Sequence, residues 1–338
     1  MPSKFVFLRT HFNAESMINT VRFLILFIVA PGFIFGQTLP ASLPLNLNTT
    51  SHQTHTSSKE TVELISKEAL LHHLAYLSSD ELQGRRTGEP GNLAARNYII
   101  DEFLSQGLEV TLQPFSFERR GTSFDAVNSI ATIKGTENPD NFIAITAHYD
   151  HVGIGKAIEN DSIYNGADDN ASGVAALLVM TKYFKENPPK NTLLFIALDA
   201  EELGLQGAKH FVENKGDKNI LLNINMDMIS RNENNEIYIC GTRYTPSLKK
   251  YFSDIPQNTI PIKFTLGHDG LDGKDDWSTQ SDHFHFYRNN IPFLYFGVED
   301  HPGYHMPSDE FEYIHPEFYY QVVRFITNTI ADLDSKIE

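Results

Sequence analysis

The chain has 338 residues, one cysteine, a formal net charge of −16 and 41% hydrophobic residues. This length and hydrophobic content are sufficient for a globular protein with a large core. The strong negative charge argues against nucleic acid or an anionic membrane surface as a partner. The single cysteine, Cys240, excludes both an intramolecular disulfide and a zinc site built from several thiolates.

The N-terminal part of the chain is typical of an export signal. The apolar stretch at residues 23–36 has the length of a signal-peptide core and is short for a membrane-spanning helix. We therefore expect residues 1–36 to be a signal peptide cleaved after Gly36, with residues 1–16 as an upstream extension if Met17 is the true start. The protein would then be periplasmic or extracellular, without stable membrane association after cleavage. An uncleaved membrane anchor is the alternative.

The rest of the chain is predicted to form a leader and one domain. Residues 37–58 are rich in Ser, Thr, Pro and Asn and poor in charge, which favours a flexible leader. After this segment there is no internal repeat and no change in composition. We therefore expect a single domain at residues 59–338.

Hydrophobic periodicity places the elements of this domain. In chain order, it predicts helices at 65–79, 93–106, 173–187, 203–215, 246–252 and 315–337, and strands at 110–119, 127–135, 141–153, 192–202, 220–230, 237–241 and 291–299. Residues 80–92 are rich in glycine and are predicted to form a loop. The alternation of strands and helices predicts an α/β fold with a doubly wound, mostly parallel central sheet and helices on both faces.

Acidic and imidazole side chains gather at the carboxyl ends of the predicted strands. They are His148, Asp150 and His151; Asp199, Glu201 and Glu202; Asp227; and Glu299, Asp300, His301 and His305, while Asp168 and Asp169 precede a helix. Each alone has a structural explanation, such as a helix cap. However, ligands of doubly wound sheets bind outside the carboxyl ends of the strands. The concentration of these residue types at one edge of the sheet therefore predicts a metal site.

The residue types also indicate which metal the site would bind. Histidine and carboxylates without thiolates suit catalytic zinc, with cobalt or manganese as substitutes. The candidate ligands are more numerous than one tetrahedral zinc needs, which fits two ions that share a carboxylate. Successive side chains at a strand end point apart, so Glu202 is predicted to bind metal while Glu201 acts as general base on the shared water.

Five motifs then resemble one known family. In chain order they are "AHYDHVG", "GADDNASG", "DAEELGLQG", "NMDMI" and "YHMPSD", and they are similar to those of the M28 family of dinuclear zinc aminopeptidases. The resemblance covers the chain from about residue 60, including the segment "LSSDELQGRRTGEPGN". It implies the zinc-dependent exopeptidase fold and two zinc ions as cofactors.

The resemblance also implies a role for seven residues. Five would be zinc ligands, with one ion on His148 and Asp227, the other on Glu202 and His305, and Asp168 bridging the two. Glu201 would be the general base, and Asp150 would hydrogen-bond the ring of His148 and orient it. The family also places a cis peptide bond after the bridging carboxylate, expected here between Asp168 and Asp169.

The expected function is therefore that of a secreted, monomeric aminopeptidase that acts on peptides with a free N-terminus. A glutaminyl-cyclase-like acyltransferase with a single zinc, a carboxypeptidase on the same fold and an inactive binding module are the alternatives. By the family pattern, Met228 and Tyr304 would flank an apolar substrate pocket, with Phe284, Phe286 and Tyr287 contributing to its lining. The acidic segment 267–276 lacks the ligand order of an EF-hand and is expected to form a solvated loop near the cleft, with a calcium site there as the alternative.

Overall fold

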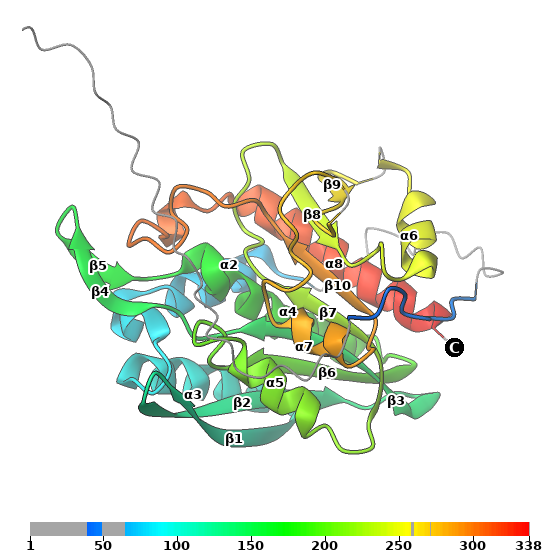
Figure 1. The fold of residues 1–338 in the computed structure, drawn as a ribbon, viewed down its shortest axis with the longest axis horizontal. Coiled ribbons are helices and arrows are strands. Elements are labelled where there is room, and N and C mark those ends of the chain that lie inside the picture. The colour runs from blue at the N-terminus through cyan, green and yellow to red at the C-terminus, as the bar shows by residue number, and fades with distance from the viewer. Residues whose placement is uncertain (1–38, 49–64, 258–259, 271, 338) are drawn as a thin grey trace, which may run out of the picture. The chain divides into compact units, whose positions relative to one another are not determined.

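The computed structural model of this chain describes residues 39–48, 65–257, 260–270 and 272–337. The predicted signal peptide therefore lies outside the described residues. The centre of the domain is an eight-stranded sheet with the strand order β1-β2-β6-β3-β7-β10-β8-β9 (Figure 1). Its strands are β1 (Glu109–Arg119), β2 (Thr122–Ile133), β3 (Asn138–His148), β6 (Asn191–Leu198), β7 (Asn219–Met226), β8 (Glu236–Cys240), β9 (Lys263–Leu266) and β10 (Phe293–Gly297).

The predicted mostly parallel sheet is confirmed. Strand β3 pairs in parallel with β6 and β7, β10 pairs in parallel with β7, and β8 pairs in parallel with β9. The hairpin β1–β2 and the pairs β2–β6 and β8–β10 are antiparallel. Because the parallel strands share a direction, the carboxyl ends of β3, β6, β7 and β10 meet at one edge of the sheet.

Helices cover both faces of the sheet, and the fully buried strand β6 shows why. Leu193, Phe195 and Ala197 belong to one core cluster, which includes α2 (Lys67–Leu77), α3 (Pro90–Ser105), α4 (Gly173–Glu186), α6 (Pro246–Ser253) and α8 (Pro316–Lys336). Leu194, Ile196 and Leu198 point to the other face and pack against α5 (Gln206–Glu213) and α7 (His283–Arg288). Among the helices that the structure describes, none is long and apolar enough to cross a membrane.

Several short elements differ from the sequence prediction. The expected loop at 80–92 contains the kinked 3-10 segment η1 (Asp80–Arg85), and α3 begins within it at Pro90, a residue favoured in the first helical turn. The hairpin β4 (Gly153–Ile158) and β5 (Asp161–Tyr164), together with β9 and α7, was not predicted. The remaining short elements are η2 (Ala167–Ser172) and η4 (Phe311–Tyr313).

The prediction of a flexible leader is wrong for residues 39–48. Leu43 is fully buried against aromatic side chains, and its backbone N–H donates to the carbonyl of Tyr244 at 2.6 Å. Tyr287 donates to the carbonyl of Pro40 at 2.9 Å, and Leu47 forms a β-bridge with Ile337. The low charge that favoured a leader equally suits a segment whose leucines fill the outer part of a core.

We therefore expect Leu43→Ala to lower the free energy of unfolding by about 2–5 kcal/mol, the usual cost of truncating a fully buried leucine. Leu39→Ala is the control, because Leu39 is 42% exposed and should change stability little. Urea unfolding of the two variants tests this. Equal midpoints for both would show that the segment does not contribute to the stability of the domain.

Candidate metal centre

Two groups of histidine and carboxylate side chains lie at the edge of the sheet where the parallel strands end. Within each group, one donor atom of every residue lies within 4.8 Å of the donor atoms of the others. Group 1 contains His148, Glu201 and Asp227, and group 2 contains His151, Asp169, Glu202 and His305. The two predicted glutamates thus belong to different groups, as expected for neighbouring side chains at a strand end.

Group 1 is built from the ends of β3 and β7. His148 is the last residue of β3, and its Nε2 atom lies 3.3 Å from Oδ1 of Asp227, which follows β7. The second oxygen of Asp227 accepts a hydrogen bond from Ser281 at 2.8 Å, and Ser281 accepts one from Asn225 at 2.9 Å. This chain of hydrogen bonds fixes one Asp227 oxygen and leaves the other directed at His148.

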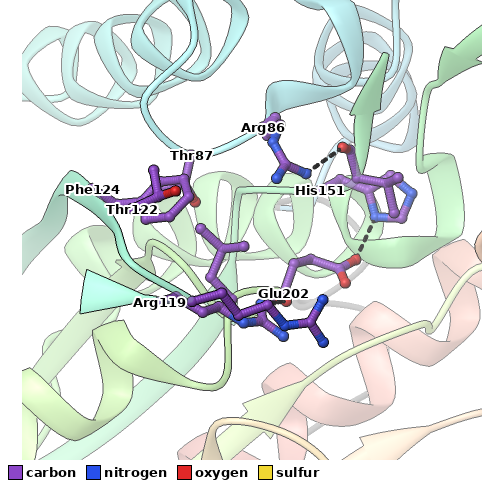
Figure 2. Close-up of a pocket in the computed structure, with 10 residues that line it drawn as sticks. Arg86, Thr87, Arg119, Thr122, Phe124, His151 and Glu202 are labelled. Atoms are coloured by element: carbon purple, nitrogen blue, oxygen red, sulfur yellow. Dashed lines mark hydrogen bonds and ion pairs between the residues drawn. The ribbon is translucent and has the colours of Figure 1, made fainter. Parts of the chain in front are cut away.

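Group 2 gathers two imidazoles around two carboxylates. The Nε2 atom of His305 lies 3.1 Å from Oδ2 of Asp169 and 3.2 Å from Oε1 of Glu202. His151, which is buried, places its Nδ1 atom 2.8 Å from the same Glu202 oxygen (Figure 2). His151 was recognised in the sequence as a residue that follows β3, but it was assigned no role.

The carboxylate that reaches both groups is Asp169. Its Oδ1 atom lies 3.4 Å from Nε2 of His148 in group 1, while its Oδ2 atom faces His305 in group 2. Its backbone N–H donates to Asp309 at 3.0 Å, which fixes its position at the start of η2. Asp169 thus occupies the position between the two groups that a bridging ligand requires.

The structure does not place Asp168, the predicted bridge, in either group. One Asp168 oxygen accepts hydrogen bonds from the backbone N–H and the hydroxyl of Ser230, at 2.7 and 2.8 Å. The other lies 3.1 Å from Nε2 of His301. The cis peptide bond is likewise displaced by one residue, to Asp169–Asn170. Successive side chains in η2 point to different sides, and the first of the two aspartates faces away from the groups.

Asp150 acts on the glutamates more than on His148. Its two carboxylate oxygens accept the backbone N–H groups of Glu201 at 3.0 Å and Glu202 at 3.2 Å. Nδ1 of His148 lies 3.1 Å from the backbone carbonyl of Asp150 but 3.7 Å from its carboxylate. The expected orientation of the His148 ring thus involves the backbone of Asp150, and its side chain positions the turn that carries both glutamates.

The third acid of this turn, Asp199, is structural. It is fully buried and accepts hydrogen bonds from Tyr149 at 2.7 Å, from Asn92 at 3.0 Å and from the backbone of Val127 at 3.0 Å. These donors balance the cost of burying a carboxylate. Asp199 therefore connects β2, β3 and α3 beneath the site and belongs to neither group.

The residues of group 2 fit a divalent metal ion. Although two imidazole nitrogens lie close to Oε1 of Glu202, this oxygen and both ring nitrogens of His151 have no hydrogen-bond partner among the described residues. Buried polar atoms normally have a partner, and nitrogen and carboxylate donors that converge in this way are what zinc requires. Burial lowers the pKa of His305, but the neighbouring carboxylates of Asp169 and Glu202 outweigh it and raise that pKa to about 11.

The buried side chain of Arg85 connects the segments that carry both groups. Arg85 is 1% exposed, and its guanidinium donates to the carbonyls of Tyr149 at 2.9 Å and Gly166 at 3.0 Å, and also to those of Leu77 and Asn165. Tyr149 follows His148 directly, and Gly166 precedes η2. Arg85 therefore joins the strand end that carries group 1 to the turn that carries Asp169.

Arg85→Met should lower the free energy of unfolding by about 3 kcal/mol or more, because it leaves several buried carbonyls without a donor. Arg120→Met is the matched control, since Arg120 is exposed and its side chain forms no hydrogen bond with any described residue. Thermal unfolding of both variants checks this. A shift in Tm no larger than that of the control would contradict the bracing role of Arg85.

Two of the residues expected to line the apolar pocket, Phe286 and Tyr287, lie in the core instead. Phe286 and Tyr287 are 0% and 3% exposed and pack in core clusters on the α5/α7 side and beneath Tyr244. Tyr304 is 37% exposed and stacks on the ring of His305, with a centroid distance of 4.0 Å. Tyr304 is therefore accessible and lies beside a residue of group 2.

The acidic segment 267–276 uses its carboxylates locally. Asp272 accepts the backbone N–H groups of His268 and Lys274, at 2.8 and 3.1 Å, and Asp269 accepts that of Arg243 at 3.0 Å. Among the described residues of this segment, the carboxylates thus serve as turn acceptors, and they are not part of any metal-type cluster.

The chain is similar in sequence to known peptidases. A model described as "Peptidase family M28" matches residues 128–330, more than half of the chain. Aminopeptidase YwaD of Bacillus subtilis is 29% identical over 246 residues, which cover 70% of this chain and 50% of that protein. A probable zinc metalloprotease of Pyrenophora tritici-repentis is 35% identical over 146 residues, which cover 41% of this chain and 32% of that protein. The chain thus spans about half the length of these relatives, or less.

Solved structures show the same fold. An aminopeptidase from Aneurinibacillus sp. strain AM-1 aligns with a TM-score of 0.66 at 16% identity and covers 82% of this chain and 96% of its own. A glutaminyl cyclase from Bacteroides thetaiotaomicron aligns with a TM-score of 0.63 at 20% identity, covering 79% and 98%. The predicted fold class is confirmed by these alignments. They also show that an aminopeptidase and a cyclase share it, so the two activities must be separated by the residues of the site.

Proposed function

The chain belongs to peptidase family M28, and we propose that it is a dinuclear zinc aminopeptidase that removes the N-terminal residue from peptides. The observation that carries this proposal is the position of Asp169, whose two oxygens lie 3.4 Å from His148 of group 1 and 3.1 Å from His305 of group 2. A carboxylate placed between two sets of donors is what two ions with a shared ligand require. His148 and Asp227 would hold one ion, and His151, Glu202 and His305 the other.

The protein residues around these ions have distinct tasks in the proposed reaction. When bound, zinc supplies Lewis acidity that polarises the scissile carbonyl and lowers the pKa of a coordinated water. Glu201 would take the proton of the attacking water and pass it to the leaving amine. Burial raises the pKa of the Glu201 carboxyl well above its ordinary value. Asp150 would keep this carboxyl in position through the backbone of Glu201.

A free α-amine on the substrate follows from this proposal. Glu201, Glu202 and Asp227 surround the site with carboxylates, which favour an amine over an acetylated amide. We expect N-acetyl-Leu-p-nitroanilide to be cleaved with a kcat/KM at least about 100-fold below that of Leu-p-nitroanilide, because the amine positions the carbonyl over the metals. Comparable cleavage of the two would contradict an aminopeptidase. Cleavage that instead requires a free C-terminal carboxyl would indicate the carboxypeptidase alternative.

The single-zinc cyclase is the second candidate, and one observation favours it. Group 2 contains two imidazoles and two carboxylates, a full ligand set for one ion without any residue of group 1. Incubation with a peptide that begins with glutamine separates the two proposals. Release of ammonia and a blocked N-terminus would support the cyclase, whereas release of free glutamine would support the aminopeptidase.

We also propose that the protein is exported through the segment at residues 1–36 and acts as a monomer. The apolar stretch that supports export lies before the first described residue. Mass spectrometry of the mature protein tests it, and a chain that begins near Gln37 is the expected result. A mature chain that retains residues 23–35 in a membrane fraction would instead identify an anchor.

A further inference from the structure

We infer that an arginine-lined cavity beside group 2 binds a carboxylate of the peptide substrate, so that the enzyme prefers anionic peptides. The cavity has a volume of about 370 Å³ (Figure 2). Its lining includes His151 and Glu202, so the cavity lies directly beside group 2. This inference rests on the proposed peptidase function and specifies its substrate class.

Three arginines from two distant segments line this cavity. Arg86 follows η1, whereas Arg119 ends β1 and Arg120 lies in the turn to β2. Figure 2 shows the Arg86 and Arg119 side chains approaching from opposite sides, with His151 and Glu202 beside them. The remaining lining includes the hydroxyl-bearing Thr87 and Thr122 and the apolar Phe124 and Leu203. Such a composition suits a residue-sized group with one negative end.

The guanidinium groups of the cavity have no carboxylate partner in the part of the chain that the structure describes. Arg119 donates to the backbone carbonyl of Glu202 at 2.7 Å, and Arg86 donates to that of Val152 at 3.2 Å. Neither these two nor Arg120 forms an ion pair with any described residue, although the whole chain carries a formal net charge of −16. A guanidinium has five N–H donors, so each retains donors for an incoming ligand.

The positive charge of the cavity is not needed to balance the neighbouring glutamates. Glu201 and Glu202 would be balanced by divalent cations in the working enzyme. Arg86, Arg119 and Arg120 line the same cavity, so their like charges repel each other, and an anion bound between them would relieve this repulsion. Carboxylates match the planar arginine fork in two-point hydrogen bonds.

Because the cavity is lined by His151 and Glu202 of group 2, three different carboxylates of a short peptide bound there could reach the arginines. They are an acidic side chain on the first residue, an acidic side chain on the second residue, and the C-terminal carboxylate of a dipeptide. All three present the same chemical group to the arginines. The experiment must therefore compare each carboxylate with its uncharged amide.

Binding is measured by calorimetry on the metal-loaded protein with peptide analogues whose scissile bond is reduced to CH2–NH, so that turnover is not required. The three pairs are Glu against Gln at the first residue, Glu against Gln at the second residue, and a free against an amidated C-terminus. In one of the three pairs, we expect the peptide with the carboxylate to bind at least about tenfold more tightly than the peptide with the amide. This is the usual gain from a hydrogen bond between charged groups. This ratio should fall towards one in Arg119→Gln and Arg120→Gln.

Arg288→Gln is the matched control, because Arg288 is exposed at the end of α7 and does not line the cavity. It should keep the binding ratio of the unmodified protein. Equal binding of both members in all three pairs would overturn the inference. A ratio that survives Arg119→Gln, Arg120→Gln and Arg86→Gln would also overturn it.

Hydrolysis of the unreduced peptides is followed separately. If peptides are cleaved but no pair shows a preference, the inference fails and the proposed function stands. If the carboxylate members bind tightly but no peptide is cleaved, the cavity is assigned correctly and the proposed function fails. The two outcomes are therefore distinguishable on the same set of peptides.

Discussion

Glu201→Gln should retain zinc and lose about 10²–10⁴-fold in kcat, the usual range for removal of a general base. Glutamine has nearly the same shape as glutamate, and the backbone N–H of Glu201 would still donate to Asp150. His148, Asp227 and the residues of group 2 remain unchanged, so metal binding should persist. However, the amide cannot accept the proton of the attacking water. The measurement is kcat on Leu-p-nitroanilide together with the zinc content of the same sample.

Glu213→Gln provides a matched control for this variant. Glu213 is exposed at the end of α5, and the same change there should leave both kcat and zinc content unaltered. Near-normal turnover in Glu201→Gln would show that another group accepts the proton. Loss of zinc from Glu201→Gln would instead assign Glu201 to the ligands of group 1.

Asp169→Ala should remove both metal and activity. Loss of a residue that only hydrogen-bonds a metal ligand lowers metal affinity roughly 10–100-fold, and we expect a larger loss of zinc affinity here. The reason is that Asp169 contributes one oxygen to each group. Asp168→Ala should instead destabilise the fold, since it leaves Ser230 and His301 without their acceptor, while zinc is retained. Zinc titration and thermal unfolding of both variants separate these effects.

The opposite outcome would restore the assignment made from the sequence. If Asp168→Ala lost zinc and Asp169→Ala kept two ions, Asp168 would be the bridge in the working protein. Each aspartate thus serves as the control for the other, since the two variants remove the same chemical group at neighbouring positions of η2.

Most of the sheet could be predicted because its strands are long and strongly apolar. Strand β6 is buried along its whole length, and this is visible in the sequence as an unbroken run from Leu193 to Leu198. The short elements β4, β5, β9 and α7 could not be predicted, because they lack the unbroken apolar run that marks β10, which is also only five residues long. Residues 39–48 resembled a leader for a related reason: their leucines are separated by prolines and small polar residues.

The site could be predicted where chemistry and topology agree. The sequence places His148, Glu202, Asp227 and His305 at the same edge of the sheet, and the structure brings them together with their neighbours in two groups. Which of the two neighbouring aspartates, Asp168 or Asp169, faces both groups depends on the backbone conformation of η2. No local sequence pattern indicates that conformation.

The remaining features of the site depend on contacts between distant segments. Arg86 and Arg119 are separated by a helix and a strand, and only the fold brings them to one cavity. His151 gave a local signal, an imidazole three residues after His148, but its orientation towards Glu202 follows from its packing. The sequence shows arginine pairs at 85–86 and 119–120, but it does not indicate that Arg85 is buried while the other three line a cavity.

Anomalous diffraction at the zinc edge, from crystals of the protein purified without chelator, tests the two-metal proposal most directly. The account predicts two peaks, one beside His148 and Asp227 and one beside Glu202 and His305, with an Asp169 oxygen directed at each. A single peak at group 2, with no density at group 1 after zinc is added in excess, would contradict the dinuclear site and favour the single-zinc cyclase.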